Sequence, residues 1–484
     1  MPRALPLILL VACNGADEDD HSVDTSADTD TDTDADADAD TDVDTDTDTD
    51  VAPLQGYAFL SRDGISDSVS YRGPVVRHVL IADLSTSIHD LTDRLETGLV
   101  PTPGDVTNEL EAIFRLDPST GGSTPHSVET DPAPLQTTYG DIASGEDLVS
   151  KLAGNDEVGQ HEDWTLAFRG WSDPAVTTPE TLVSLWFAEL DAAAVDWSTG
   201  IYPLTPDGTP VSAVYVTADG RDLARLIETF LRVGIHYSQA ADDHLDDDTA
   251  GEGLLSDHSA LEEGSPYTSL EHHWDQGFGH AGMSRQYGDW TREQQLTGAV
   301  DDDSDGRIDL VAEKAFHLAI DAPKRDDGAF TNADMAGELY DAMVAGRELL
   351  ATTEGPLAPD ELLLLRGHRD AALSTWERIL AANVVHGINQ TLADMEAIGG
   401  KDYVFEDHAK HWSEMKGFAL GFQFSRHSAL NGGQFVALHS YLGQRPMLSS
   451  DGPKALETYE HDLLDARILL QAAFDFDPAD VEAW

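Results

Sequence analysis

The chain has 484 residues, of which 91 are acidic and 28 basic, giving a formal net charge of −63 at pH 7. A negative field of this size argues against nucleic acid as a partner and against direct docking on anionic lipid, while it attracts cations. The single cysteine excludes a disulfide within the chain, so the fold must be held by its core, with or without help from metal ions.

The first residues have the pattern of a bacterial lipoprotein signal. An apolar run from Leu5 to Val11 follows Arg3, and the small residue Ala12 precedes Cys13. We therefore predict that residues 1–12 are a signal peptide and that Cys13 is lipidated, which anchors the exported protein to a membrane. The alternative is a stray thiol in an ordinary cleaved signal peptide.

The next segment, residues 13–54, is predicted to be a disordered acidic tether behind the lipidated cysteine. Asp alternates with Thr or Ala almost without break from Asp28 to Asp50, so like charges repel and little apolar surface is available for burial. Because an extended chain spans at most about 3.3 Å per residue, the tether can reach on the order of 100 Å. Loose Ca²⁺ binding or glycans on the threonines are alternatives to a plain spacer. Asn14, rather than an aspartate, follows the cysteine, which favours the outer membrane of the cell envelope.

Residues 55–484 are predicted to form a single large all-α domain with long loops and minor β structure. Of the acidic residues, 17 lie in residues 1–51 with 1 basic residue, which leaves 74 acidic and 27 basic residues beyond and a net charge of −47. No later apolar span reaches the roughly 18 residues that would cross a bilayer. A short hairpin arm is expected over Val211 to Thr217, where β-branched residues alternate.

Apolar spacing of three and four residues predicts the helices. They are expected at Pro74–Leu95, Ser144–Leu152, Pro179–Ala194, Leu223–Leu231, Thr268–Tyr287, Asp309–Ile320, Asn332–Leu350, Leu362–Val385, Gln390–Ile398, Phe405–Phe424 and Pro453–Ala473.

A calcium loop is predicted after Val300, where the chain reads D-x-D-x-D-G-x-I-D. Carboxylates at positions 1, 3 and 5, a glycine at 6 and a carbonyl at 7 are the ligand pattern of such loops. Position 12, where an EF-hand has a bidentate glutamate, is Ala312, with a glutamate one residue later. We expect a structural calcium clip; the alternative is a solvated acidic turn. The candidate ligands are Asp301, Asp303, Asp305, Arg307 through its carbonyl, Asp309 and Glu313.

Histidine and carboxylate residues at helical spacing suggest a second, transition-metal site between packed helices. Its candidate ligands are Glu271, His272, Asp275, His411 and Glu414. The alternative is that these side chains form buried hydrogen bonds and ion pairs that fix the helices.

Several phrases resemble the family of bacterial envelope lipoproteins with domain of unknown function 4856. They are SVSYRGPVVR (Ser68–Arg77), LQTTYGDIASGEDLVSKLAGN (Leu135–Asn155), EHHWDQGFGH (Glu271–His280), DSDGRIDLVAEKAF (Asp303–Phe316), KRD (Lys324–Asp326), GRELL (Gly346–Leu350) and HWSEMKGFALGFQF (His411–Phe424). The resemblance spans most of residues 57–445 and implies an envelope location and a helical fold, but no catalytic residue. The central phrase departs from the family pattern at Gln276, Gly277 and His280. His411-x-x-Glu414 is also loosely similar to the G-x-H-x-x-E motif of imelysin-like helical proteins, but the glycine position is Ala409.

Two functions are compatible with these features. The first is a membrane-anchored envelope lipoprotein that displays a calcium-stabilised α-helical domain for binding a metal ion, a metal complex or a protein partner. The second is a metal-dependent envelope enzyme, imelysin-like or a hydrolase, with its site between helices. The sequence has no H-E-x-x-H, no G-x-S-x-G and no glycine-rich phosphate loop, so it leaves catalysis open.

Overall fold

The computed structural model describes residues 56–156 and 160–484, and polar caps fix where three of its helices begin. At each of these three helices an oxygen of the capping side chain accepts a hydrogen bond from a backbone N–H of the first turn, which would otherwise have no partner. The capped helices are α7 (Pro179–Ser198) behind Thr178, α8 (Leu223–Leu231) behind Asp222 and α9 (Ser269–Ala281) behind Thr268.

The remaining elements are also helical. The α-helices are α1 (Arg72–His89), α2 (Leu91–Glu96), α3 (Asp105–Phe114), α4 (Pro118–Gly121), α5 (Tyr139–Ile142), α6 (Trp164–Ala167), α10 (Arg292–Thr297), α11 (Leu318–Gly328), α12 (Met335–Thr352), α13 (Pro359–Ala397), α14 (Phe405–Ala419), α15 (Gly432–Leu442), α16 (Pro453–Phe474) and α17 (Pro478–Ala483). Short 3-10 helices are η1 (Val149–Lys151), η4 (Gly253–Leu255), η5 (Tyr287–Asp289), η6 (Leu420–Gln423) and η7 (Ser449–Asp451), and π-helical turns are η2 (Arg232–Tyr237) and η3 (Ala240–His244).

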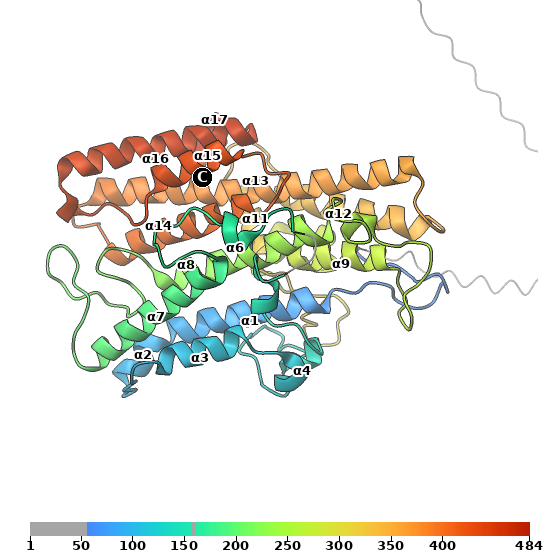
Figure 1. Cartoon of the computed structure of the whole chain (residues 1–484), viewed down its shortest axis with the longest axis horizontal. Coiled ribbons are helices and arrows are strands. Elements are labelled where there is room, and N and C mark those ends of the chain that lie inside the picture. The colour runs from blue at the N-terminus through green and yellow to red at the C-terminus, as the bar shows by residue number, and fades with distance from the viewer. Residues whose placement is uncertain (1–55, 157–159) are drawn as a thin grey trace, which may run out of the picture. The chain divides into compact units, whose positions relative to one another are not determined.

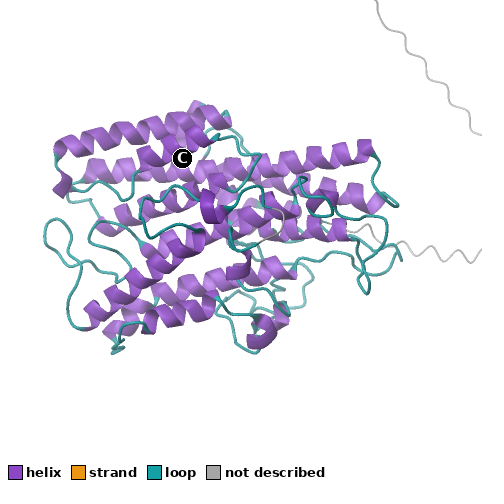
Figure 2. Ribbon diagram, viewed as in Figure 1, coloured by secondary structure: helices purple, strands orange, loops and turns teal. Residues whose placement is uncertain are grey.

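The predicted all-α class is confirmed (Figure 2). Among the described residues, β structure is limited to isolated bridges such as Leu60 with Asp67 and Pro134 with Ile308. The hairpin arm predicted over residues 211–217 is wrong, because Val216 makes only one bridge, to Asp222, and the rest of the segment is turn and loop.

The long helix α13 is the axis of the C-terminal half. It packs against α11, α12, α14 and α16, and α15 covers α16 (Figure 1). The approach of α14 depends on Gly387, because a Cβ at that position would lie 2.7 Å from Cβ of Met415. The N-terminal half is built around α1, which packs against α3, α8 and α9. Helix α8 contacts both α1 and α14 and so joins the two halves.

A single helical run continues from α8 through η2 and η3 and ends near Leu245. Its backbone changes from α to π geometry at Arg232, returns briefly to α at Ser238 and Gln239, and becomes π again to His244. Both π segments lie against α9. This run carries the polar residues of the candidate site into the middle of the domain.

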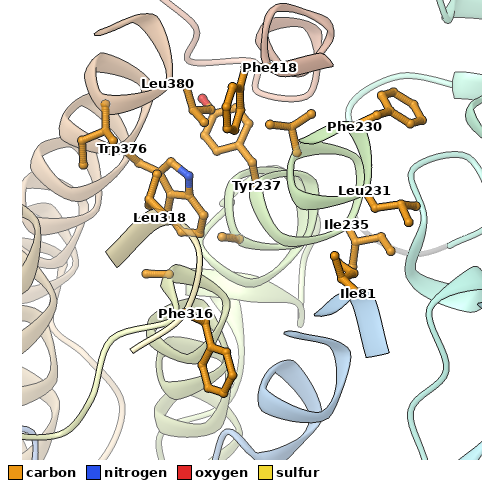
Figure 3. Close-up of a cluster of buried hydrophobic side chains, with 14 of the residues drawn as sticks. Ile81, Phe230, Leu231, Ile235, Tyr237, Phe316, Leu318, Trp376, Leu380 and Phe418 are labelled. Atoms are coloured by element: carbon orange, nitrogen blue, oxygen red, sulfur yellow. The ribbon is translucent and has the colours of Figure 1, made fainter. Parts of the chain in front are cut away.

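Apolar side chains surround the run on the side of α13 and α14. Figure 3 shows this cluster, in which Tyr237 of η2 lies near Trp376 of α13 and Phe418 of α14, while Phe230 of α8 lies farther from these two side chains. All four are buried, as are most of their neighbours. The cluster excludes water from one flank of the run, so any polar group there must find a protein partner or a ligand.

Two predicted helices are wrong in position. Residues 144–152 contain only the 3-10 turn η1, and residues 309–317 form a loop that precedes α11. Two others, at 362–385 and 390–398, merge into α13, since Gly387 serves close packing and does not break the helix. The helices α3, α4, α5, α6, α10, α15 and α17 were not predicted.

The predicted signal peptide, Cys13 and the acidic tether lie outside the described residues. Contacts group the described residues, 56–156 and 160–484, into one compact unit. Within the described ranges we find no helix that is both long enough and apolar enough to cross a membrane.

Candidate metal centre

Six histidines lie next to one another through the interior, and we call them the histidine row. Successive ring centroids are 3.6 to 5.4 Å apart. Nδ1 of His244 lies 3.1 Å from Nδ1 of His273, and Nδ1 of His236 lies 3.0 Å from Nδ1 of His280. In spatial order the row is His273, His244, His280, His236, His78 and His317.

The π-helical run brings two members of the row to face α9. His236 lies in η2 and His244 in η3, and each contacts a histidine of α9. A π turn pairs residues i and i+5, one residue more than an α turn, so it changes which side chains face a neighbouring helix. Such turns are rare and occur frequently at functional sites.

Burial keeps the imidazoles of the row neutral. It lowers the pKa of His78 to about 3 and that of His273 to about 4, and it lowers the pKa values of the other four well below 6.5. A neutral imidazole has one N–H donor and one nitrogen lone pair, and the lone pair is what a metal ion binds.

At one end of the row a carboxylate joins two imidazoles. Asp243, His244 and His273 each offer one ligand atom, and the three atoms lie within 4.8 Å of one another. Asp243 and His244 come from η3 and His273 from the facing helix α9, so two packed elements hold the group. The side chains of His244 and His273 are 11% and 15% exposed, which leaves this end of the row at the domain edge.

The surroundings of this group are acidic with one cation. Nζ of Lys151 lies 3.8 Å from Oδ2 of Asp243, and Oε2 of Glu252 lies 3.7 Å from Nε2 of His273. Burial raises the pKa of the Asp243 carboxyl to about 7, although Lys151 acts in the opposite direction. A divalent cation would replace the proton that this carboxyl otherwise holds at acidic pH.

The other end of the row borders a small cavity of about 20 Å³. Its lining includes His78, His236, His280 and His317, and each has one buried ring nitrogen without a hydrogen-bond partner. His317 also has a φ of +37°, a strained conformation for a residue other than glycine. The cavity has room for one water molecule. No three of these histidines have ligand atoms that converge as those of Asp243, His244 and His273 do.

A second group of similar composition is held by arginines. Asp246, Asp247 and His427 also bring ligand atoms within 4.8 Å of one another. Arg426 contacts Asp246 at 2.6 Å and Arg366 contacts Asp247 at 2.6 Å, so guanidinium groups already neutralise both carboxylates. This makes the second group an ion-pair network.

The predicted calcium loop brings together three of its six candidate residues. Carboxylate oxygens of Asp301, Asp303 and Asp305 lie within 4.8 Å of one another. Gly306 has a φ of +84°, which the sharp turn requires and which glycine adopts without strain. Backbone N–H groups of residues 305 and 306 donate to Asp301 and so hold the turn closed.

The other three candidates have different contacts. Oδ1 of Asp309 accepts hydrogen bonds from Gln136 and from the N–H of Val311. Glu313 is buried and accepts from the N–H groups of residues 302, 303 and 309, so it supports the loop from inside. The Arg307 side chain donates to the carbonyl of Pro134, a contact that does not involve the backbone carbonyl predicted as a ligand.

The five residues predicted to hold a transition metal do not form one site. Glu271 and Asp275 both pair with the fully buried Arg347, at 3.1 and 3.0 Å. His272 instead stacks on Tyr267, with 4.7 Å between ring centroids. None of the groups with converging ligand atoms in the described chain contains any of these residues.

His411 and Glu414 lie on α14, away from that ion pair. Nδ1 of His411 lies 2.7 Å from Oδ2 of Asp394, and Oε1 of Glu414 lies 3.4 Å from Nε of Arg225. Both line a different cavity, between α8, α11, α13 and α14. For Glu271 and Asp275, the contacts with Arg347 match the alternative to a metal site, in which these side chains form buried ion pairs that fix the helices.

Sequence reasoning missed Asp243 and His244. They are adjacent in the chain, and adjacent residues of an α-helix point about 100° apart. In the π turn η3 both nevertheless approach His273. The signal that the sequence offered was the concentration of Asp and His, from Asp242 to Asp248, at the end of an apolar helix.

The comparisons with known proteins concern the middle of the chain. No curated protein and no solved structure matches it. Residues 176–354 match the model of a family described as Domain of unknown function (DUF4856), a narrower span than the phrases of the sequence indicated. The matched part contains Asp243, His244 and His273, but not His411 or Glu414. It also contains the predicted calcium loop with Asp301, Asp303 and Asp305, which we call the aspartate loop. The match thus supports membership of residues 176–354 in that domain family.

Proposed function

We propose that the chain is a lipid-anchored binding protein of the bacterial cell envelope, whose helical domain binds a divalent transition-metal ion through Asp243, His244 and His273. The observation that supports this most directly is the convergence of one carboxylate and two neutral imidazoles from two packed elements. Two imidazoles and a carboxylate are a donor set that suits Zn²⁺, Fe²⁺ and related ions.

The charge of the domain favours the same function. Residues 52–484 carry a net charge of −47, which raises the local concentration of cations. Asp243 has Lys151 as its only cationic neighbour within 4 Å among the described residues, whereas Asp246 and Asp247 are already paired with arginines. A metal ion at Asp243 would therefore compete with one lysine at 3.8 Å, whereas at Asp246 and Asp247 it would have to displace arginines that contact the carboxylates directly.

A calcium ion at Asp301, Asp303 and Asp305 is the second part of the proposal. Its role would be structural, because the loop lies between α10 and α11 and is tied to Gln136 through Asp309. Outside the cell, sites with dissociation constants of about 10⁻⁴ to 10⁻³ M suffice for calcium.

Metal content and metal affinity together test the transition-metal site. The full-length protein is extracted from its native envelope in detergent and its metals are measured by mass spectrometry; the metal-free protein is then titrated with Zn²⁺. We expect one transition-metal ion per chain, and a loss of Zn²⁺ affinity of at least about tenfold in His244→Gln and His273→Gln.

The matched control is His427→Gln, which changes the arginine-held group, and it should bind Zn²⁺ like the unchanged protein. Equal affinity in all of these proteins would contradict the proposed site. The same extraction tests the anchor, since Cys13→Ala should move the protein out of the membrane fraction; retention there would contradict lipidation of Cys13.

A further inference from the structure

A cavity of about 290 Å³ lies between four helices. Its walls come from α8 and η2, from α11, from α13 and from α14. The volume is at the lower end of the range of small-molecule sites, so the cavity suits a small ligand.

Basic residues are concentrated at this cavity. Its lining holds five of the 27 basic residues that follow residue 51, together with only three carboxylates, Glu228, Asp321 and Glu414. At neutral pH the lining therefore carries two positive charges more than negative ones, in a domain whose net charge is −47. The basic residues are Arg225, Arg232, Lys324, Arg325 and Lys410.

The three carboxylates already form ion pairs with three of these basic residues. Glu228 contacts both Arg225 and Arg232, and Asp321 contacts Arg232 at 3.2 Å. Asp321 also holds Lys324, at 3.2 Å, while Glu414 lies 3.4 Å from Arg225.

Arg325 and Lys410 remain without an anionic partner. Neither makes an ion pair with any residue of the described chain. Nε of Arg325 is buried and has no hydrogen-bond partner, and the same holds for Nε of Arg232 and Nδ2 of Asn383. All three atoms are donors, all belong to residues that line the cavity, and burial lowers the pKa of Arg325. Unpaired buried donors and a desolvated cation are costly unless an acceptor meets them.

We propose that this cavity binds a small oxyanion with two or more negative charges, which Arg325 and Lys410 contact. Such a ligand presents several anionic acceptor oxygens to the unpaired donors of the lining, and its charge offsets the positive excess. Phosphate and small dicarboxylates share this chemistry. The site is independent of the proposed metal site, because none of the residues that line it is Asp243, His244 or His273.

Calorimetric titration of the full-length protein with inorganic phosphate, and separately with succinate, tests the proposal and distinguishes the two ligand sources. Each titration is run at low ionic strength with chloride as the reference anion. We expect at least one of the two to bind, with an affinity that falls as salt is added.

Arg325→Gln and Lys410→Gln should each weaken binding by about tenfold or more, as expected for the loss of a charged hydrogen bond. The matched control is Lys401→Gln, since Lys401 is 90% exposed and does not line the cavity. Because Arg325 lies between packed helices, thermal unfolding is recorded for every variant, and Lys410→Gln tests the site even where Arg325→Gln does not fold. No binding of either anion, or binding that both folded variants retain in full, would show that these charges only hold the helices together.

Discussion

At Gly346 the packing of α12 leaves no room for a side chain. A Cβ there would lie 1.9 Å from a ring atom of Trp274 in α9. The next residue of α12, Arg347, is fully buried and forms ion pairs with Glu271 and Asp275 of α9. The glycine thus sets the distance at which α12 can supply its guanidinium to α9.

A methyl group at this position tests that packing. We expect Gly346→Ala to lower the free energy of unfolding by about 2 kcal/mol or more, because the Trp274 ring cannot move without disturbing its hydrogen bond to Met343. Gly367 is the matched control, since it lies in α13 with nothing within 4 Å of an added Cβ. Gly367→Ala should raise stability by about 0.5 to 1 kcal/mol through helix propensity alone. Denaturant unfolding measures both; equal effects would contradict the close approach.

The partners of Glu271 and Asp275 explain why the transition-metal prediction chose other residues. Their spacing of four placed them correctly on one helix face, but the cation that they meet is Arg347, 72 residues beyond Asp275. Spacing within a segment identifies a shared face. It contains no information about what a distant segment brings to that face.

At the scale of elements, long amphipathic helices were predictable from sequence and loops were not. The predictions at residues 179–194 and 453–473 correspond to α7 and α16, where caps or a proline at the first turn agree with the apolar spacing. Over residues 309–317 the spacing is misleading, because the Ile308 backbone bonds to Ala133 and Leu135, and Gln136 bonds to Leu310. Contacts with a segment about 175 residues earlier decide this conformation.

The aspartate loop allows a test on one element. If its calcium dissociation constant is about 10⁻⁴ M, then 10 mM calcium should raise the free energy of unfolding by about 2.7 kcal/mol. EDTA should reverse the effect. Asp301→Asn should lose the response, because Asp301 both belongs to the converging group and closes the turn.

Asp341→Asn, which changes an exposed carboxylate of α12, should keep the calcium response in the same unfolding experiment. Identical unfolding midpoints of the unchanged protein in calcium and in EDTA would contradict a structural calcium ion.

For the whole molecule, the buried histidines predict sensitivity to acid. Burial lowers the pKa of His78 to about 3 and that of His386 and His408 to about 4, and it holds those of His236 and His317 well below 6.5. Above pH 6.5 these groups are neutral in both the folded and the unfolded chain. Below pH 6.5 only the unfolded chain takes up their protons, so each lowers the free energy of unfolding by about 1.4 kcal/mol per pH unit.

Four buried carboxyls oppose this trend. Burial raises the pKa of Glu377 and Asp243 to about 7 and of Asp222 and Asp275 to about 6, so their contribution to the free energy of unfolding is lost as pH rises from about 4. The histidines outnumber these carboxyls, and we therefore expect the thermal midpoint, measured in EDTA at constant ionic strength, to decrease as the pH is lowered from 7.5 to 5.0. A midpoint that stays constant or increases as the pH is lowered would show that these histidines are not neutral in the folded state.

The two π turns between Arg232 and His244 make the number of residues in this stretch as important as their identity. A π turn holds one residue more than an α turn, so a single-residue deletion within it would let the turn relax to α geometry while the helix beyond it keeps its orientation. A deletion in the α-helical part of the run, in α8, has no such compensation and would rotate everything beyond it by about 100°. His244 would then leave the face that meets His273, although every histidine and aspartate of the site was still present. A relative that is one residue shorter here and keeps the metal site is therefore expected to lack that residue within a π turn and not within α8.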